Sequence, residues 1–272
     1  FFFSSRRRHT RYPLVMEFRR VLFRSGAPTH LPQPGRLAAN PAARRKTASV
    51  SSGRRLVLWR HGRTAWNKER RIQGHADVPL DEVGFEQARR SARVLAGLVP
   101  TAIVCSDSVR AVDTAAALVE LTGIVPTYDA RLRETHLGAW EGLTDAQVRE
   151  QFADEWIAWH RDEPELRAGG GETRAEVAVR VCAAIDDALA SHNNGSATLV
   201  VVSHGAALRV AMARLMGLPQ EHWPALGGFA NCAWSVLSEP DDPTTGETIS
   251  GRWRLTEHNA ASLPDVVIGD DS

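Results

Sequence analysis

The stretch "LVLWRHGRTAWN" (residues 56–67) joins a short apolar run to three residues that interrupt it, Arg60, His61 and Gly62. The run belongs to "RRLVLW" (54–59), which is too brief for a helix and is typical of a buried strand. A glycine permits a sharp turn, and the amides that follow it can point at a bound anion. We therefore expect a buried strand that ends at the binding site of a charged ligand.

Strand patterns alternate with helix patterns along the rest of the chain. Further strands are predicted at 101–107, 125–132 and 198–205, and a terminal antiparallel pair at 231–239 and 251–259. Strands that alternate with helices are typical of a sheet that is covered by helices on both faces. The predicted fold class is therefore α/β, a three-layer α/β/α sandwich with a mainly parallel, mixed central sheet.

The first two helices are predicted from apolar spacing and from end signals. One spans 80–98 with Asp81 as its N-cap, and its apolar face comprises Phe85, Ala88, Ala92, Leu95 and Val99. The next spans 109–122 and stops near Gly123.

Three later segments complete the predicted helical layers. A single helix is expected from Thr144 to about His160, with its aromatic residues on one side. The glycines at 169–171 are predicted to form a flexible loop, and a capping box of Thr173 and Glu176 starts the following helix. A last helix follows the strand at 198–205 and ends near Gly217.

The charge distribution separates residues 1–53 from the rest. Of 33 basic and 32 acidic residues, 11 and 1 lie in residues 1–53, which leaves 22 and 31 for residues 54–272. The excess of acidic residues in 54–272 argues against a groove that binds nucleic acid there. Residues 1–53 are expected to be disordered, as a linker or as non-native sequence. The first 25 resemble adapter-derived DNA translated in frame with a gene; a targeting peptide and a nucleic-acid-binding arm are the alternatives.

The remaining bulk features indicate one ordinary globular domain. We place that domain at 54–260 and a frayed tail at 261–272. The three cysteines lie far apart and form no metal-binding spacing, so we interpret them as reduced thiols of a cytoplasmic protein. No apolar run reaches 18 residues, and no membrane span is expected.

Polar residues gather where the predicted strands end. The first strand ends at Arg60-His61-Gly62, and the second leads through Ser106 to Arg110 at the start of a helix. Glu134 follows the third strand, and the fourth ends in Ser203-His204-Gly205. Ligands of open α/β sheets bind beyond the carboxyl ends of the strands. We therefore expect these residues to meet at one site.

A phosphoryl group is the ligand that this set of residues fits best. Arginine forks match phosphate oxygens, so Arg60 and Arg110 are expected to clamp the group, with His204 as a further donor. A neutral imidazole is a competent nucleophile, and His61 could attack if its other nitrogen donates to a carbonyl. Glu134 could then protonate the leaving oxygen and later deprotonate water.

Six segments resemble, in order, the histidine phosphatase superfamily, which has the phosphoglycerate-mutase-like fold. They are "RHGRTAWN", "IQGHADVPLDEVGFEQA", "SDSVRAVDTA", "RLRETHLGAWEGL", "GGGE" and "VSHG", and they run over residues 54–218. The resemblance implies that His61 is phosphorylated and that Glu134 is the proton donor. It also implies a phosphate pocket and further substrate contacts made by Arg60, Arg110, His204, Gly205, Asn67 and Gln73. No metal and no cofactor are implied.

By the same resemblance, mutases of the superfamily typically carry a longer insertion and a different run after the acidic residue, so "ETHLGAWEGL" after Arg133 implies hydrolysis. The segments at 131–144 and 222–234 resemble those of bacterial glucosyl-3-phosphoglycerate phosphatases, so that compound or a similar sugar-acid phosphate is the expected substrate. The alternatives are a phosphoglycerate mutase, a broad-specificity acid phosphatase and a phospholigand-binding protein without turnover. A zinc site on the two histidines lacks a third ligand at a recognised spacing.

Several of these residues also have structural interpretations. Glu134 could pair with Arg131 or Arg133, Asn67 and Gln73 could cap turns, and Glu172 could cap the next helix. The expected partner is a small phosphate ester, with no nucleic acid and no membrane. The short polar third strand is a candidate homodimer edge.

Overall fold

The structure is a computed structural model, and it describes residues 53–192 and 197–262. In this part of the chain a six-stranded sheet has the order β3-β2-β4-β1-β5-β6. The strands are β1 (Arg55–Arg60), β2 (Ala102–Cys105), β3 (Thr127–Tyr128), β4 (Thr198–Ser203), β5 (Trp234–Ser238) and β6 (Arg254–Ala260). Strands β3, β2, β4 and β1 are parallel, and β5 is antiparallel to both β1 and β6. The predicted mixed sheet is confirmed.

The two central strands bring the two His-Gly turns to one edge of the sheet. Strands β1 and β4 pair in parallel register, with Arg60 opposite Ser203. All six residues of β4 are buried, as expected for an apolar strand that is covered on both faces. Because both strands end at the same level, His61 and His204 leave the sheet side by side.

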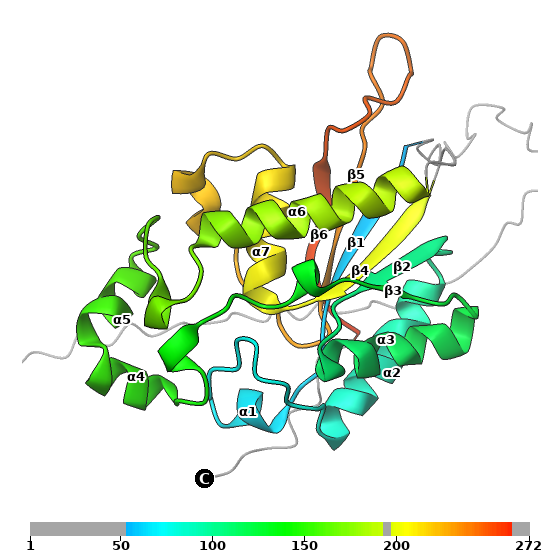
Figure 1. Ribbon diagram of the computed structural model, residues 1–272. Coiled ribbons are helices and arrows are strands. Elements are labelled where there is room, and N and C mark those ends of the chain that lie inside the picture. The colour runs from blue at the N-terminus through cyan, green and yellow to red at the C-terminus, as the bar shows by residue number, and fades with distance from the viewer. Residues whose placement is uncertain (1–52, 193–196, 263–272) are drawn as a thin grey trace, which may run out of the picture. The chain divides into compact units, whose positions relative to one another are not determined.

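Helices cover both faces of this sheet (Figure 1). On one face α2 (Glu82–Ala96) and α3 (Val109–Thr122) pack against Val57, Trp59 and the residues of β4 that share their side. On the other face α6 (Arg174–Ser191) and α7 (Gly205–Leu215) pack against Leu56 and Leu58. The three-layer α/β/α sandwich is therefore confirmed.

Shorter elements connect these layers near the carboxyl ends of the strands. The α-helices are α1 (Ala65–Lys68), α4 (Asp145–Gln151) and α5 (Ala153–His160). The 3₁₀ helices are η1 (Ala130–Leu132), η2 (Gly138–Trp140), η3 (Ala168–Gly170) and η4 (Gln220–Ala225). The predicted third strand is thus mostly wrong: β3 has two residues, and η1 replaces its second half.

Most predicted helix ends are confirmed. Asp81 caps α2 by accepting from the Gly84 amide, and α3 ends at Gly123, whose φ of 71° is left-handed. Thr173 and Glu176 form the expected capping box of α6. These ends were predictable because a cap depends on residues within one turn of the helix.

The expected single helix over 144–160 is wrong. The chain breaks at Phe152, whose φ and ψ of −132° and 46° are not helical. No glycine or proline marks the break. Phe152, Trp156 and Trp159 instead surround the buried ring of Trp140, with ring centroids 5.8 to 6.3 Å apart. The break is a consequence of this packing, which apolar spacing alone does not reveal.

Two residues of the predicted α2 face are not buried. Phe85 is 39% exposed, and Val99 is 73% exposed and lies beyond the end of the helix. The buried face instead starts at Gly84, where a side chain would overlap the Arg63 carbonyl oxygen. The helix approaches the turn after β1 so closely that only glycine fits at the contact.

Other predictions concern the termini, the cysteines and the membrane. Apart from Gly53, Ala261 and Ser262, the predicted segments 1–53 and 261–272 lie outside the described residues. The domain boundaries therefore stay predictions. All three cysteines are buried free thiols. None of the helices in the described part of the chain is both long and apolar enough to cross a membrane.

Candidate active site

The two histidines meet at the carboxyl edge of the sheet. The ring centroids of His61 and His204 lie 5.2 Å apart with a T-shaped geometry. Arg110, at the start of α3, donates from Nε to His204 Nδ1 at 3.2 Å. Ser106, just beyond β2, contacts the other nitrogen of His204 at 2.9 Å. Three of the four predicted strand ends therefore converge directly.

His61 has the tautomer that a nucleophile requires. Its Nδ1 lies 2.7 Å from the carbonyl oxygen of Gly62. A carbonyl oxygen only accepts, so Nδ1 carries the proton and Nε2 keeps a free lone pair. Burial, together with the charges of Arg60 and Arg110, lowers the pKa of His61 well below its ordinary value. The imidazole is therefore neutral near pH 7 and presents an unprotonated nitrogen.

Gly62 is required by packing rather than by a special turn conformation. A side chain at Gly62 would lie 2.5 Å from the Gly84 carbonyl oxygen of α2, and Gly62 does not have a positive φ. Its amide donates to Thr114 Oγ1 at 3.0 Å, which ties the turn to α3. Helices α2 and α3 thus hold the turn that carries His61.

Two guanidinium groups, Arg110 buried and Arg60 partly buried, lie near this histidine pair. Arg110 is fully buried and donates to the carbonyl oxygens of Gly74 and Ala76 at 2.8 and 2.7 Å. Arg60 donates to the Phe229 carbonyl oxygen at 2.5 Å, and its buried Nε has no partner in the described part of the chain. Burial lowers the pKa of both arginines.

This arrangement favours a bound anion. Among the described residues, neither Arg60 nor Arg110 has a carboxylate within ion-pair distance. A buried and a partly buried cation without a close counter-ion are costly, and an anion bound near them would offset that cost.

His204 has the opposite tautomer to His61. Arg110 Nε can only donate, so His204 Nδ1 accepts and its Nε2 carries the proton. That proton points to Ser106 Oγ, which in turn contacts Ser108 Oγ at 3.3 Å. Burial and then the Arg110 charge lower the pKa of His204 well below its ordinary value. The expected donation from His204 to phosphate stays a prediction.

Glu134 reaches the site from the segment after η1 and lies at the start of α7. Its carboxylate accepts from the amides of Ala206 and Ala207 at 3.1 and 2.9 Å, and from the amide of Thr135 at 2.9 Å. Backbone amides at a helix N-terminus favour an anionic partner.

The salt-bridge interpretation of Glu134 is wrong. Arg131 pairs with Asp129 and Asp187, and Arg133 pairs with Asp107. Among the described residues the Glu134 carboxylate therefore has no arginine within ion-pair distance, and its hydrogen bonds come from backbone amides.

Asn67 has the predicted capping role and also keeps a free group. Its Oδ1 accepts from the amide and the hydroxyl of Thr64, which forms the capping box of α1. No described group accepts a hydrogen bond from Asn67 Nδ2. Gln73 is buried, and its Oε1 has no partner among the described residues. Both amides therefore retain an unused polar atom, as a ligand contact would need.

Gly205 is the place where Arg60 packs against α7. A side chain at Gly205 would lie 3.2 Å from Arg60 Nε. The absence of a side chain thus lets the guanidinium lie directly over the start of the helix.

The glycine-rich loop packs closely on a neighbouring segment at two of its glycines, and its flexibility stays a prediction. Side chains at Gly169 and Gly171 would overlap the carbonyl oxygens of Leu137 and His136. The loop therefore lies backbone to backbone on the segment that follows Glu134, a close approach that only glycine permits.

The capping interpretation of Glu172 is wrong, because Arg180 of α6 binds its carboxylate in a bidentate ion pair at 2.8 Å. Arg180 also donates to the carbonyl oxygens of Arg131, Arg133 and Glu134. It thereby fixes the segment that carries Glu134. Sequence reasoning missed Arg180 because nothing in the helix pattern distinguishes it from a surface arginine.

Ser106 was expected near the site from its place after the second strand, but no contact was assigned to it. Asn231 was missed. Asn231 donates to the turn after β1, and no pattern around it indicates this contact.

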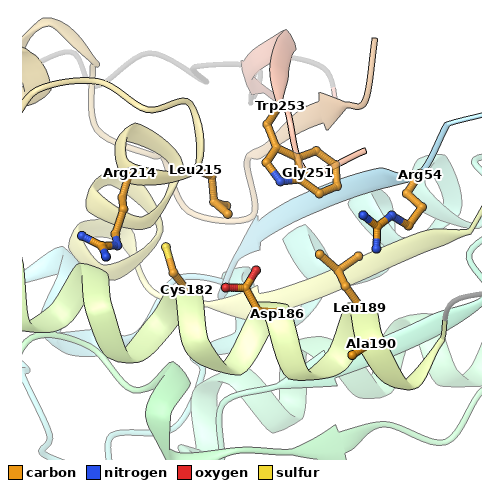
Figure 2. A pocket seen from close by; sticks show the side chains of 9 residues that line it. All are labelled: Arg54, Cys182, Asp186, Leu189, Ala190, Arg214, Leu215, Gly251 and Trp253. Carbon is orange, nitrogen blue, oxygen red and sulfur yellow. The ribbon is translucent and has the colours of Figure 1, made fainter. Parts of the chain in front are cut away.

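The cavity in Figure 2 lies away from these residues. Its volume is about 460 Å³, and Arg54, just before β1, is one of the residues that line it. Cys182, Asp186 and Leu189 point from α6 toward Trp253 across it. It therefore opens near the amino end of β1, whereas His61 follows the carboxyl end, and it contains none of the predicted site residues.

The fold and the site define an α/β protein with a histidine-centred anion site at the carboxyl edge of its sheet. Residues 56–251 match the sequence pattern of the histidine phosphatase superfamily (branch 1). The chain belongs to the histidine phosphatase superfamily, and it is a phosphatase of the phosphoglycerate-mutase-like fold.

Curated relatives agree with this assignment. Glucosyl-3-phosphoglycerate phosphatase of Mycobacterium tuberculosis (strain CDC 1551 / Oshkosh) is 41% identical over 215 residues, which cover 77% of this chain and 96% of the relative. The protein of the same name from Mycolicibacterium vanbaalenii is 39% identical over 216 residues, with the same coverage. A probable phosphoglycerate mutase of Enterobacter sp. (strain 638) is 38% identical over 192 residues, 69% of this chain and 86% of the relative.

Solved structures show the same relationship. A mycobacterial glucosyl-3-phosphoglycerate phosphatase complexed with VO₃ matches with a TM-score of 0.70 and 41% identity, and the match covers 76% of this chain and all of that chain. Bacillus stearothermophilus YhfR matches with a TM-score of 0.67 and 30% identity, over 78% of this chain and all of that chain.

Proposed function

We propose that this protein is a metal-independent phosphomonoesterase that forms a phosphohistidine at His61. The observation that carries the proposal is the His61 Nδ1 contact with Gly62 at 2.7 Å, near the guanidinium groups of Arg60 and Arg110. The contact leaves Nε2 free to attack, and the guanidinium groups suit the charge of a phosphoryl group in its transition state.

The proposed first step transfers the phosphoryl group to the enzyme. His61 Nε2 attacks phosphorus, the bond to the ester oxygen breaks, and protonated Glu134 gives its proton to that oxygen.

The proposed second step returns the enzyme to its starting state. Glu134, again a carboxylate, takes a proton from water, whose oxygen attacks phosphorus and breaks the bond to His61. The amides of Ala206 and Ala207 stabilise the ionised carboxylate that this step requires. Inorganic phosphate leaves, and neutral His61 is restored.

The proposed substrate is glucosyl-3-phosphoglycerate or a similar sugar-acid phosphate. Relatives with that name match at 41% identity over almost their whole length. The segments at 131–144 and 222–234 carried the same resemblance. The mutase alternative has weaker support, since the probable mutases match over a smaller share of both chains. Cytoplasmic location and a homodimer stay predictions of the sequence.

Rapid quenching with phosphate-labelled substrate tests the proposed nucleophile. We expect acid-labile, base-stable label on the wild-type protein and none on His61→Ala, because of the two site histidines it is His61 whose Nε2 is free to attack. His160→Ala, which changes an exposed histidine of α5, is the matched control and should keep the label. Full labelling and turnover in His61→Ala would contradict the proposal.

A panel of phosphate esters tests the substrate. We expect kcat/KM to be highest for glucosyl-3-phosphoglycerate, with release of inorganic phosphate that persists in EDTA. Isomerisation of 3-phosphoglycerate faster than phosphate release would instead support a mutase.

A further inference from the structure

Asn231 connects the segment before β5 to the turn that carries His61. Its Nδ2 donates to the carbonyl oxygens of His61 and Gly62, both at 3.3 Å. It also donates to Asn67 Oδ1 at 3.1 Å. One side-chain amide thus contacts the nucleophile's turn and the neighbouring asparagine at the same time.

The contact with Asn67 fixes the orientation of the Asn67 amide. Asn67 Oδ1 accepts from Thr64 N, Thr64 Oγ1 and Asn231 Nδ2. Three donors around one atom require an oxygen there, so the nitrogen of the Asn67 amide must occupy the other position. Asn67 therefore keeps its Nδ2 as a donor for a phosphate oxygen.

The contact with Gly62 supports the tautomer of His61. The Gly62 carbonyl oxygen accepts from His61 Nδ1 at 2.7 Å and from Asn231 Nδ2 at 3.3 Å. The second donor holds the peptide group against which His61 orients. A rotation of that peptide would remove the acceptor that keeps the proton on Nδ1.

The backbone already holds this segment in place without the Asn231 side chain. Cys232 N donates to the His61 carbonyl oxygen, and Arg60 N donates to the Ala233 carbonyl oxygen. On its other side, Ala230 N donates to Asn259 Oδ1 at 2.8 Å. The amide of Asn231 is therefore an addition to the pairing of the segment with β1, and its contacts all concern the site.

We infer that Asn231 is a positioning residue for phosphoryl transfer, which acts through the Asn67 amide and the Gly62 carbonyl group. The inference rests on the proposed role of His61 as nucleophile. Asn231 does not touch the reacting atoms. It keeps Asn67 Nδ2 directed as a donor and keeps His61 Nε2 unprotonated.

The test compares phosphohistidine formation, kcat and KM in Asn231→Ala, Asn231→Asp and Asn67→Ala. Asn231→Asp is isosteric, but it replaces the donor by a carboxylate that faces three acceptors. Removing hydrogen bonds of this kind should lower kcat/KM by about 10-fold in Asn231→Ala, and by more in Asn231→Asp. Asn259→Gly is the matched control, because it removes a contact of the same segment away from the site and tolerates the φ of 51°.

A double-mutant cycle and NMR separate positioning from general destabilisation. In the Asn67→Ala background, Asn231→Ala should lower kcat/KM by less than about 3-fold further, since coupled residues are not additive. Nitrogen-15 NMR of the His61 ring should show the proton on Nδ1 in the wild type and a growing Nε2-protonated fraction in Asn231→Ala. A merely structural role would change the unfolding midpoint and leave the tautomer unchanged.

The outcomes distinguish this inference from the proposed function. If wild-type protein forms no phosphohistidine, the proposed function fails and the inference with it. If wild type is labelled, but both Asn231 variants keep wild-type rates and the His61 tautomer, only the inference is overturned. Should Asn231→Ala not fold, Asn231→Asp takes its place, with the larger loss of kcat/KM expected for it.

Discussion

At the scale of single residues, the two histidines differ in where each proton lies. His61 donates from Nδ1 to a backbone carbonyl oxygen, whereas His204 accepts on Nδ1 from Arg110. Each tautomer is fixed by a neighbour that can only accept or only donate. The site therefore holds one imidazole with a free Nε2 and one whose Nε2 proton is directed at Ser106.

The low pKa of His61 leads to a prediction about its titration. Burial and the charges of Arg60 and Arg110 oppose protonation, so His61 should remain neutral at pH 6 in the free protein. NMR titration of the His61 ring should give a midpoint below the value of about 6.5 found for a reference peptide. A midpoint at or above that value would contradict the prediction.

At the scale of elements, α2 and the turn after β1 approach each other through two glycines. Gly62 and Gly84 leave no room for side chains, because each would overlap backbone of the other segment. Asp81, the N-cap of α2, also accepts from Arg63 Nε at 2.8 Å. The position of the His61 turn therefore depends on the exact fit of a helix that carries no reacting group.

Gly84→Ala tests this dependence. Its added methyl group would lie 2.1 Å from the Arg63 carbonyl oxygen, so α2 must shift and carry the turn with it. We expect the free energy of unfolding to fall by about 1–3 kcal/mol, as for other overpacked sites, and kcat to fall as well. Urea unfolding and steady-state kinetics measure both. Gly228→Ala, which adds a methyl group in open space, should change neither; equal effects in the two variants would refute the explanation.

At the scale of the whole domain, the ionisable groups buried at the site lower the stability of the fold. Arg110, His61 and His204 are buried, and Arg60 is partly buried, at the carboxyl edge of the sheet where β1 and β4 end. In the folded protein the pKa of each imidazole is lowered and the ring is neutral, whereas in the unfolded chain each ring has an ordinary pKa. Stability should therefore depend on pH.

The sign of that dependence follows from proton uptake. Below a pH of about 6.5 the unfolded chain binds protons at both histidines and the folded state does not, so the free energy of unfolding falls as the pH falls. The two histidines together can change the free energy of unfolding by at most about 2.7 kcal/mol per pH unit. Urea unfolding between pH 7.5 and 5.5 measures the slope. A His61→Gln, His204→Gln double variant with an undiminished slope would contradict this origin.

The sequence by itself determined the features that depend on short stretches of chain. The apolar runs specified β1 and β4, and residues within one turn specified the caps of α2, α3 and α6. Because each run ends at a His-Gly pair, the residues expected at the site were identifiable in advance. The family resemblance then followed from the order of the segments.

Only the tertiary structure decided what depends on contacts between distant segments. The break at Phe152, the packed Gly169 and Gly171, and the ion pair of Arg180 with Glu172 arise from neighbours far apart in the chain. Asn231 lies 170 residues beyond His61, yet its amide reaches that turn. Local patterns specify which strands end in reactive residues. The tautomers and orientations of those residues depend on donors and acceptors that only folding brings within hydrogen-bond distance.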